Sequence, residues 1–215
     1  MESSRLPQTF WLGAALVFIL LGLAYLMSVA EFEKQHALPS LGTVADFSLT
    51  NQDGEAATLS RLTNHVWVAD IIFTRCAGPC PRMTGQMKSL QDKLPPASDV
   101  RLVTLTTDPD FDTPPVLKKY GERFGADFGR WTFLTGTKSE IGLLAANSLK
   151  LSATPIDPRD QKDSADLFIH TTIFVVVDKH ARLRTVFQTG GEGVDWTNAV
   201  LPKLVATVRR LEHEP

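Results

Sequence analysis

Two cysteines, Cys76 and Cys80, lie four residues apart in a chain of 215 residues that contains no other cysteine. The apolar run before them, residues 66–73, predicts a buried β-strand, and residues 83–94 have the composition of a helix. Thiols at a strand-to-helix turn are placed for chemistry, because the N-terminus of a helix favours thiolate over thiol. We therefore expect this pair to bind a metal ion or to react with a disulfide.

The four-residue spacing itself bears on that choice. On an ideal helix the Cα atoms of residues i and i+4 are about 6.2 Å apart, against about 5 Å for residues i and i+3. Disulfides span about 4.4–6.8 Å between Cα atoms, so a bridge is permitted but lies toward the wide end. A structural bridge across three residues would close almost no loop and would stabilise the fold little. Pro79 and Pro81 make a regular helix through both cysteines unfavourable.

A metal site requires further ligands besides the two sulfurs. Thiolates suit Cu(I), zinc and iron–sulfur clusters, and imidazole suits copper and zinc. His170 is the strongest candidate, because it stands at the entry to a predicted core strand, residues 173–177, which we expect to approach the cysteine turn. The remaining histidines are predicted to lie on the solvated surface or at the far end of the cysteine strand: His36, His65, His180 and His213.

The elements that must position these groups alternate between strand and helix. A hairpin around residues 46–54 comes first, and the last predicted elements are two strands and a closing helix that Asp195 begins. Between them we predict strands at 66–73, 100–106 and 131–134, and helices at 83–94, from Asp112 as N-cap to about 124, and at 138–147. Residues 151–166 are predicted to form a surface loop. This order predicts an α/β, thioredoxin-like fold with an N-terminal β-hairpin extension.

The N-terminal segment differs in character from the remainder of the chain. Residues 9–30 contain no charge, and a helix of that length covers a hydrocarbon core of about 30 Å. We predict a cytoplasmic N-terminus (1–8), a single transmembrane anchor (9–30), a tether (31–40) and an exported domain (41–215). Arg5 before the apolar run and Glu31 after it place the N-terminus in the cytoplasm. The alternative is a cleaved signal peptide, since residues 28–30 match a small-x-small cleavage site.

Composition excludes little but indicates no nucleic-acid partner. The chain has 22 basic and 24 acidic residues and no basic patch. Met83 and Met87 could offer thioether sulfur to Cu(I), but their helical spacing is more typical of core residues.

Four motifs, in order along the chain, resemble the Sco/SenC family of copper-binding proteins. They are Phe73-Thr74-x-Cys76-x-x-x-Cys80-Pro81, Thr107-Asp108-Pro109-x-x-Asp112-Thr113-Pro114, Trp131-x-x-Leu134-Thr135-Gly136, and His170-Thr171-Thr172 before a strand that ends in Asp178. The resemblance extends from about residue 41 to about residue 211. It implies a thioredoxin-like domain behind one membrane anchor, on the periplasmic side of a bacterial inner membrane.

The resemblance also implies a function. Family members bind copper, as Cu(I) or Cu(II), through the two motif cysteines and the later histidine, so Cys76, Cys80 and His170 inherit the ligand roles. They help to metallate the binuclear copper site of cytochrome c oxidase subunit II, or act as thiol-disulfide reductants of that site. We therefore expect a membrane-anchored copper chaperone whose partner is this subunit or a similar exported copper protein.

Two differences from the family pattern keep other functions open. Residues 77–79 lack the acidic residue common between the cysteines, and Ile169 replaces an aspartate common before the histidine. Less negative charge weakens the attraction for a cation, Cu(II) above all. The first alternative is a thioredoxin-type thiol-disulfide oxidoreductase with Cys76 and Cys80 as its catalytic pair, in which Cys76 attacks a partner disulfide. The second is a peroxide-reducing relative, or a zinc-binding one with an open two-Cys, one-His site.

Overall fold

The computed structural model describes the backbone of residues 8–36, 38–151, 153–155, 168–170 and 172–214. Within these segments it does not describe the side chains of residues 8–10, 12–14, 29–36, 153–155 and 168–170. The chain divides into two compact units, Met1–Pro39 and Ser40–Pro215.

The first unit contains one helix, α1 (Gln8–His36), of 29 residues. Its described side chains are largely apolar and exposed to solvent; Phe18 is 75% exposed and Met27 is 70% exposed. Over the part of the chain that the structure describes, no helix meets both the length and the apolar character needed to cross a membrane. The predicted anchor at 9–30 is therefore not confirmed.

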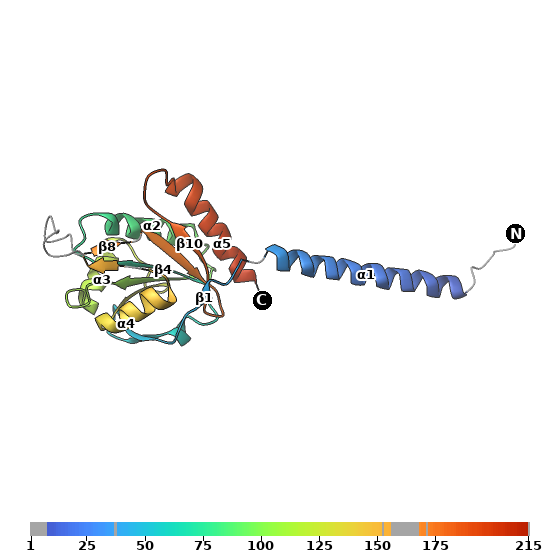
Figure 1. Ribbon diagram of the computed structural model, residues 1–215, viewed down its shortest axis with the longest axis horizontal. Helices are drawn as coiled ribbons and strands as arrows, with labels where there is room; N and C mark the ends of the chain where they lie inside the picture. The colour runs from blue at the N-terminus through green and yellow to red at the C-terminus, as the bar shows by residue number, and fades with distance from the viewer. Residues whose placement is uncertain (1–7, 37, 152, 156–167, 171, 215) are drawn as a thin grey trace. The chain divides into compact units, whose positions relative to one another are not determined.

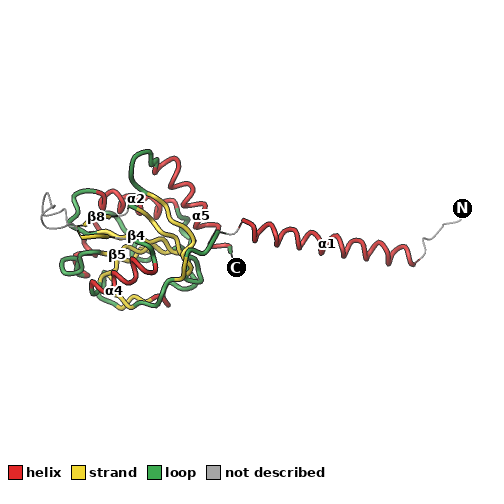
Figure 2. Tube along the Cα trace, in the orientation of Figure 1, coloured by secondary structure: helices red, strands yellow, loops and turns green. Residues whose placement is uncertain are grey.

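The second unit is built on an eight-stranded sheet in the order β1-β10-β9-β4-β5-β6-β2-β3 (Figures 1 and 2). Its strands are β1 (Gly42–Thr43), β2 (Ser48–Asn51), β3 (Ala56–Thr58), β4 (Trp67–Ile72), β5 (Arg101–Thr106), β6 (Trp131–Thr135), β9 (Ile173–Val177) and β10 (Arg182–Gln188). The β4–β5 and β5–β6 pairs are parallel, whereas β4–β9 and the outer pairs are antiparallel. The predicted hairpin is present as β2 and β3.

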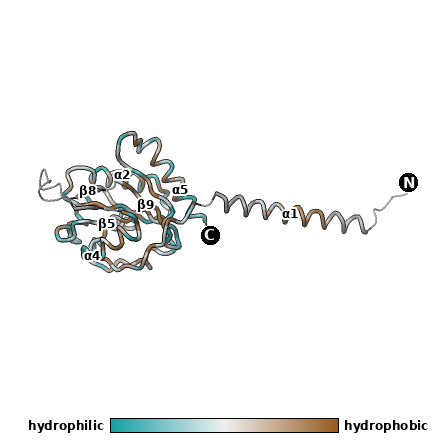
Figure 3. The backbone as a smooth tube through the Cα atoms, viewed as in Figure 1, coloured by the Kyte–Doolittle hydropathy of each residue, from teal (hydrophilic) through white to brown (hydrophobic). Residues whose placement is uncertain are grey.

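Strand β4 lies near the middle of this sheet and is buried along its whole length. Such double-sided burial explains why its sequence, WVADII, is apolar almost throughout instead of alternating with polar residues. Trp67, Ala69 and Ile71 belong to a core cluster on one face, together with Ile141 and Leu144. Apolar colouring in Figure 3 follows the central strands β5 and β9.

Helices cover both faces of the sheet. They are α2 (Pro79–Lys93), α3 (Pro114–Arg123), α4 (Lys138–Gly142), which continues as η2 (Leu143–Ser148), and α5 (Leu201–His213), which follows η3 (Trp196–Val200). In Figure 1, α2 and α5 lie on one face and α4 lies on the other. Tyr120 of α3 hydrogen-bonds Thr84 of α2 across 2.9 Å, so α3 packs beside α2. Asp195 accepts a hydrogen bond from the Asn198 N–H, which confirms it as the predicted cap.

A second, two-stranded sheet was not predicted. It pairs β7 (Ala153–Pro155) with β8 (Phe168–His170) in antiparallel register, with Ala153 opposite His170. Part of the predicted loop at 151–166 is therefore strand, and residues 156–166 lie outside the described residues.

Candidate metal centre

The two cysteines lie at the junction between β4 and α2. Cys76 is in the turn after the strand, where its backbone N–H donates to the carbonyl oxygen of Phe73 at 3.2 Å. Cys80 is the second residue of α2, which begins four residues earlier than the sequence predicts. Prolines are tolerated there because the first turn of a helix contains N–H groups that need no intrahelical partner. Because α2 starts at Pro79, Cys80 lies in the helix and Cys76 lies in the turn before it.

Both cysteines are thiols and both are buried: Cys76 is 8% exposed and Cys80 is 0% exposed. The hydrogen bond with the Cys76 side chain is the main cause that raises the pKa of the Cys80 thiol, and burial adds to it. The Cys76 thiol and burial therefore act against the preference for thiolate that we expect from the helix N-terminus at Cys80. A bound soft cation would replace the shared proton, so metal binding must release protons here.

The third predicted ligand, His170, is the last residue of β8. Its backbone is described but its side chain is not, so its role as a ligand stays a prediction. Among the described side chains, no three of His, Cys, Asp or Glu form a group able to hold a metal ion. The described site therefore consists of two adjacent sulfur donors. This donor pair fits a soft cation such as Cu(I) better than a hard one such as Mg²⁺.

Asp112 organises the approach to Cys76. It is fully buried and accepts hydrogen bonds from the Thr74 backbone N–H at 3.0 Å, from the Thr74 hydroxyl and from the Thr106 hydroxyl. Burial raises the pKa of Asp112, and the threonine hydrogen bonds act against that rise. The prediction that Asp112 caps α3 is wrong, because Thr113 occupies the N-cap position. The carboxylate instead ties the cysteine turn to the end of β5.

A second contact fixes the residue next to Cys76. Arg75 donates to Asp108 at 2.5 Å, and its guanidinium lies 4.2 Å from the centre of the Phe111 ring. Asp108 in turn donates its backbone N–H to the Thr106 hydroxyl at 3.0 Å. The charge of Arg75 is therefore paired within the chain, although 42% of its side chain is exposed.

Asp70 of β4 is the residue that sequence reasoning missed. It is fully buried, and neither carboxylate oxygen has a hydrogen-bond partner among the described residues. Burial raises its pKa to about 7. The neighbouring Thr104 hydroxyl lowers the pKa of Asp70, although the two groups do not reach hydrogen-bonding geometry. The Thr104 hydroxyl instead accepts a hydrogen bond from the indole N–H of Trp131 at 2.9 Å. The charge of Asp70 also raises the pKa of Cys80. Because side chains alternate along a strand, the Asp70 carboxyl lies on the face opposite the core cluster that contains Ala69 and Ile71.

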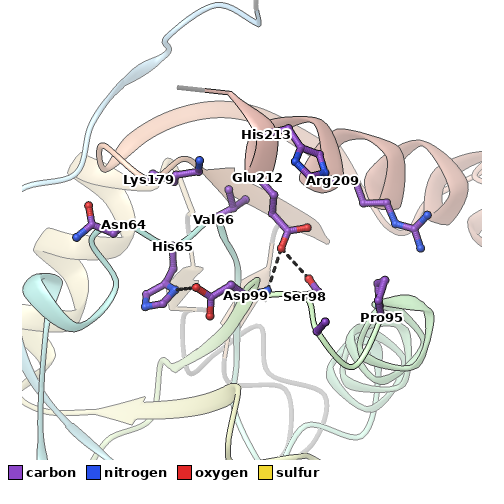
Figure 4. Close-up of a pocket in the computed structure, with 11 residues that line it drawn as sticks. Asn64, His65, Val66, Pro95, Ser98, Asp99, Lys179, Arg209, Glu212 and His213 are labelled. Atoms are coloured by element: carbon purple, nitrogen blue, oxygen red, sulfur yellow. Dashed lines mark hydrogen bonds and ion pairs between the residues drawn. The ribbon is translucent and has the colours of Figure 1, made fainter.

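A cavity of about 580 Å³ lies at the other end of the central strands (Figure 4). His65 and Asp99, which precede β4 and β5, face each other across 3.0 Å. Glu212 of α5 accepts hydrogen bonds from the Ser98 hydroxyl and the Asp99 N–H, each at 2.9 Å. These contacts fasten the end of α5 to the sheet. The cavity is thus separated from the cysteines by the length of β4, and its polar groups are largely engaged with one another.

Comparison with known proteins places this chain in one family. The SCO1/SenC family model matches residues 36–203. The chain belongs to the SCO1/SenC family. It is 37% identical over 158 residues to the SCO1 protein homolog of Bacillus subtilis (strain 168), which covers 73% of this chain and 79% of that protein.

Solved structures of Sco proteins share the thioredoxin-like α/β fold. BsSco, described as a Sco family cytochrome c oxidase assembly protein with a disulfide switch, matches with a TM-score of 0.67 at 30% identity, over 84% of this chain and all of that one. A SCO1/SenC family lipoprotein of Bacillus anthracis matches with a TM-score of 0.66 at 28% identity, over 81% and 98% of the two chains. The copper-bound ScoI of Bradyrhizobium japonicum, at 22% identity and a TM-score of 0.63, shares the fold over 79% and 99% of the two chains.

Proposed function

We propose that this SCO1/SenC protein binds one copper ion through Cys76, Cys80 and His170 and delivers it to the binuclear copper site of cytochrome c oxidase. The observation that carries the proposal is the pair of buried thiols in hydrogen-bonding contact at the junction of β4 and α2. Two thiolates hold Cu(I) well, and burial protects it from water and oxidants. Imidazole would supply the third donor. The related BsSco belongs to the cytochrome c oxidase assembly proteins, which supports this target.

The proposal predicts a specific pattern of copper binding. The purified chain should bind one Cu(I) ion, and Cys76→Ser and Cys80→Ser should each abolish stoichiometric binding. His170→Ala should weaken binding by more than about 100-fold, beyond the 10–100-fold typical of losing an outer-shell contact. Affinity is measured by competition with a chromophoric Cu(I) chelator.

The matched control is His180→Ala, which removes an exposed imidazole from the turn between β9 and β10 and should leave affinity unchanged. Full affinity in either cysteine variant would refute the proposed site. Equal losses in the two histidine variants would remove His170 from it.

A specific observation favours one alternative, thiol-disulfide exchange. Cys76 is slightly exposed and Cys80 is not, as an attacking and a resolving thiol should be. In this reaction Cys76 thiolate attacks a partner disulfide and one partner thiolate leaves. Cys80 then displaces the second partner sulfur, so that the chain is oxidised and the partner is reduced by two electrons. Strong reduction of insulin disulfides, unchanged in His170→Ala, would favour this alternative over copper delivery.

We further propose that residues 9–30 anchor the chain in a bacterial inner membrane as a single span, with the copper-binding domain on the periplasmic side. The support is the uncharged run in the sequence and the exposed apolar side chains of α1, since extended exposed apolar surface marks membrane or protein contacts.

The anchor predicts how the protein distributes on cell fractionation. The full chain should sediment with membranes and resist alkaline carbonate extraction, whereas a chain starting at residue 31 should be recovered as a soluble protein. Mass spectrometry of the membrane-bound form distinguishes an uncleaved anchor from a processed one. Recovery of the full chain in the soluble fraction at its uncleaved mass would contradict the anchor.

A further inference from the structure

The loop that follows β10 contacts both the helix that carries Cys80 and the segment that follows His170. Five residues make these contacts, and we call them the Gly190 junction: Arg82, Gln86, Thr172, Thr189 and Gly190. Arg82 and Gln86 belong to α2 and stand two and six residues after Cys80. Thr172 stands two residues after His170 and immediately before β9. The junction is therefore the described link between the two parts of the proposed copper site.

On the helix side, the junction contains one hydrogen bond and one close packing contact. The Gln86 side-chain amide donates to the carbonyl oxygen of Thr189 at 2.8 Å. Gln86 is 7% exposed and Thr189 is 2% exposed, so water competes little for this bond. The guanidinium of Arg82 lies over Gly190: a Cβ atom added there would be 2.2 Å from Nη2 of Arg82. Only a residue without a side chain leaves room for that contact.

On the histidine side, the loop holds Thr172 by two bonds. The N–H of Thr189 donates to the carbonyl oxygen of Thr172 at 2.8 Å, and the Thr172 hydroxyl donates to the carbonyl oxygen of Gly190 at 3.2 Å. Gln188 donates to the same Gly190 carbonyl at 3.1 Å and stiffens the loop. Thr172 therefore cannot shift relative to α2 without breaking bonds within the junction.

The junction is not built for stability alone. Gln86 Oε1 and Thr189 Oγ1 are buried without a hydrogen-bond partner among the described residues. Buried polar atoms of this kind destabilise a fold, and apolar side chains of similar size would avoid that penalty. A junction that keeps them uses its polar groups to fix the position of a neighbouring segment.

We propose that the Gly190 junction positions His170 against the cysteine pair by fastening Thr172 to α2. This inference rests on the proposed copper function and names residues that determine the affinity of that site without contacting the ion. Gly190 is its sensitive point, because any side chain there displaces the Arg82 guanidinium and meets the Thr172 hydroxyl at 3.0 Å. The clash falls on the mobile end of Arg82, so Gly190→Ala is expected to fold.

The experiment compares Gly190→Ala with Gly85→Ala, a matched substitution on α2 where an added Cβ meets nothing within 4 Å. In the copper-free protein, the Thr189 amide should exchange with solvent faster in Gly190→Ala and at the wild-type rate in Gly85→Ala. Cu(I) affinity should fall about 10–100-fold in Gly190→Ala, as for loss of an outer-shell contact, and stay unchanged in the control. Gln86→Met, which removes the donor but keeps the length, should act in the same direction as Gly190→Ala.

A double variant separates positioning of His170 from general loosening of the fold. If the junction acts through His170, Gly190→Ala should cause no further loss of affinity in a His170→Ala background. Additive losses, or an unchanged Thr189 exchange rate in Gly190→Ala, would overturn this inference alone. A wild-type chain that binds no Cu(I), or binds it equally well without His170, would overturn the proposed site and this inference with it.

Discussion

Asp70→Asn should stabilise the protein at pH 8 by up to about 4 kcal/mol. The pKa of this buried carboxyl is raised from 3.8 to about 7, and each pKa unit corresponds to about 1.36 kcal/mol. The native state therefore holds a proton that the unfolded state loses at lower pH. The contribution of Asp70 to the free energy of unfolding is fully present below pH 3.8 and is lost as the pH rises toward 7. Above pH 7 this contribution changes no further. Asparagine, which resembles the protonated acid, avoids the loss.

The measurement is urea unfolding of both proteins between pH 4 and pH 9. The difference in unfolding free energy should be small near pH 4, grow through pH 5–7 and become constant above. Asp110→Asn serves as the control, because Asp110 forms an exposed pair with Lys138 and such pairs contribute less than about 1 kcal/mol. A difference for Asp70→Asn that does not vary with pH would show that Asp70 is not the titrating group.

Asp112→Ala should have the opposite and equally large effect, destabilising the fold by about 3–5 kcal/mol. The substitution leaves three donors from the half-buried Thr74 and the buried Thr106 without their acceptor, and a buried donor that loses its partner costs about 1–3 kcal/mol. Because Thr74 lies two residues before Cys76, the cysteine turn should loosen as well. Cys76 should then react faster with a thiol-alkylating reagent.

The control for this prediction is Thr113→Ala. Thr113 is the N-cap of α3 but makes no capping side-chain hydrogen bond, so its loss should change stability by less than about 0.5 kcal/mol. An Asp112→Ala effect as small as that of Thr113→Ala would contradict the role of Asp112 in tying the cysteine turn to β5. Should Asp112→Ala not fold, Thr106→Val removes one of the three donors and should still destabilise measurably, since it also withdraws the acceptor of the Asp108 N–H.

The central part of the fold could be predicted because burial leaves a strong pattern. The runs around β4, β5 and β9 are apolar enough to be assigned as strands directly, and they fix the position of the cysteine turn. The start of α2 was predicted too late, since Pro79 and Pro81 interrupt helices everywhere except in the first turn, where they stand. β7 and β8 are three residues each, too short to show a period.

The sulfur donors of the site could be predicted from the sequence, but the buried carboxyl groups around them could not. The pair of cysteines four residues apart is evident from the sequence alone. Met83 and Met87 are core residues as predicted, and each is 0% exposed. The local sequence around Asp112 indicated only a helix cap, and its actual role depends on tertiary contacts with Thr74 and Thr106 that the sequence does not show. Asp70 did leave a signal: it is the single charge in an otherwise apolar strand, which should be taken as a sign of function.

The two outer strands of the main sheet have a consequence for the protein at high concentration. β1 contains two residues and β3 contains three, whereas the strands between them contain four to seven. At the β3 edge, a short strand exposes few unpaired backbone groups and gives a second copy little to extend by strand addition. At the opposite edge, β1 pairs only with Arg182 and Leu183, so beyond Leu183 the edge of the described sheet is β10 itself. Association between copies by strand addition is therefore expected along β10 and not along β3.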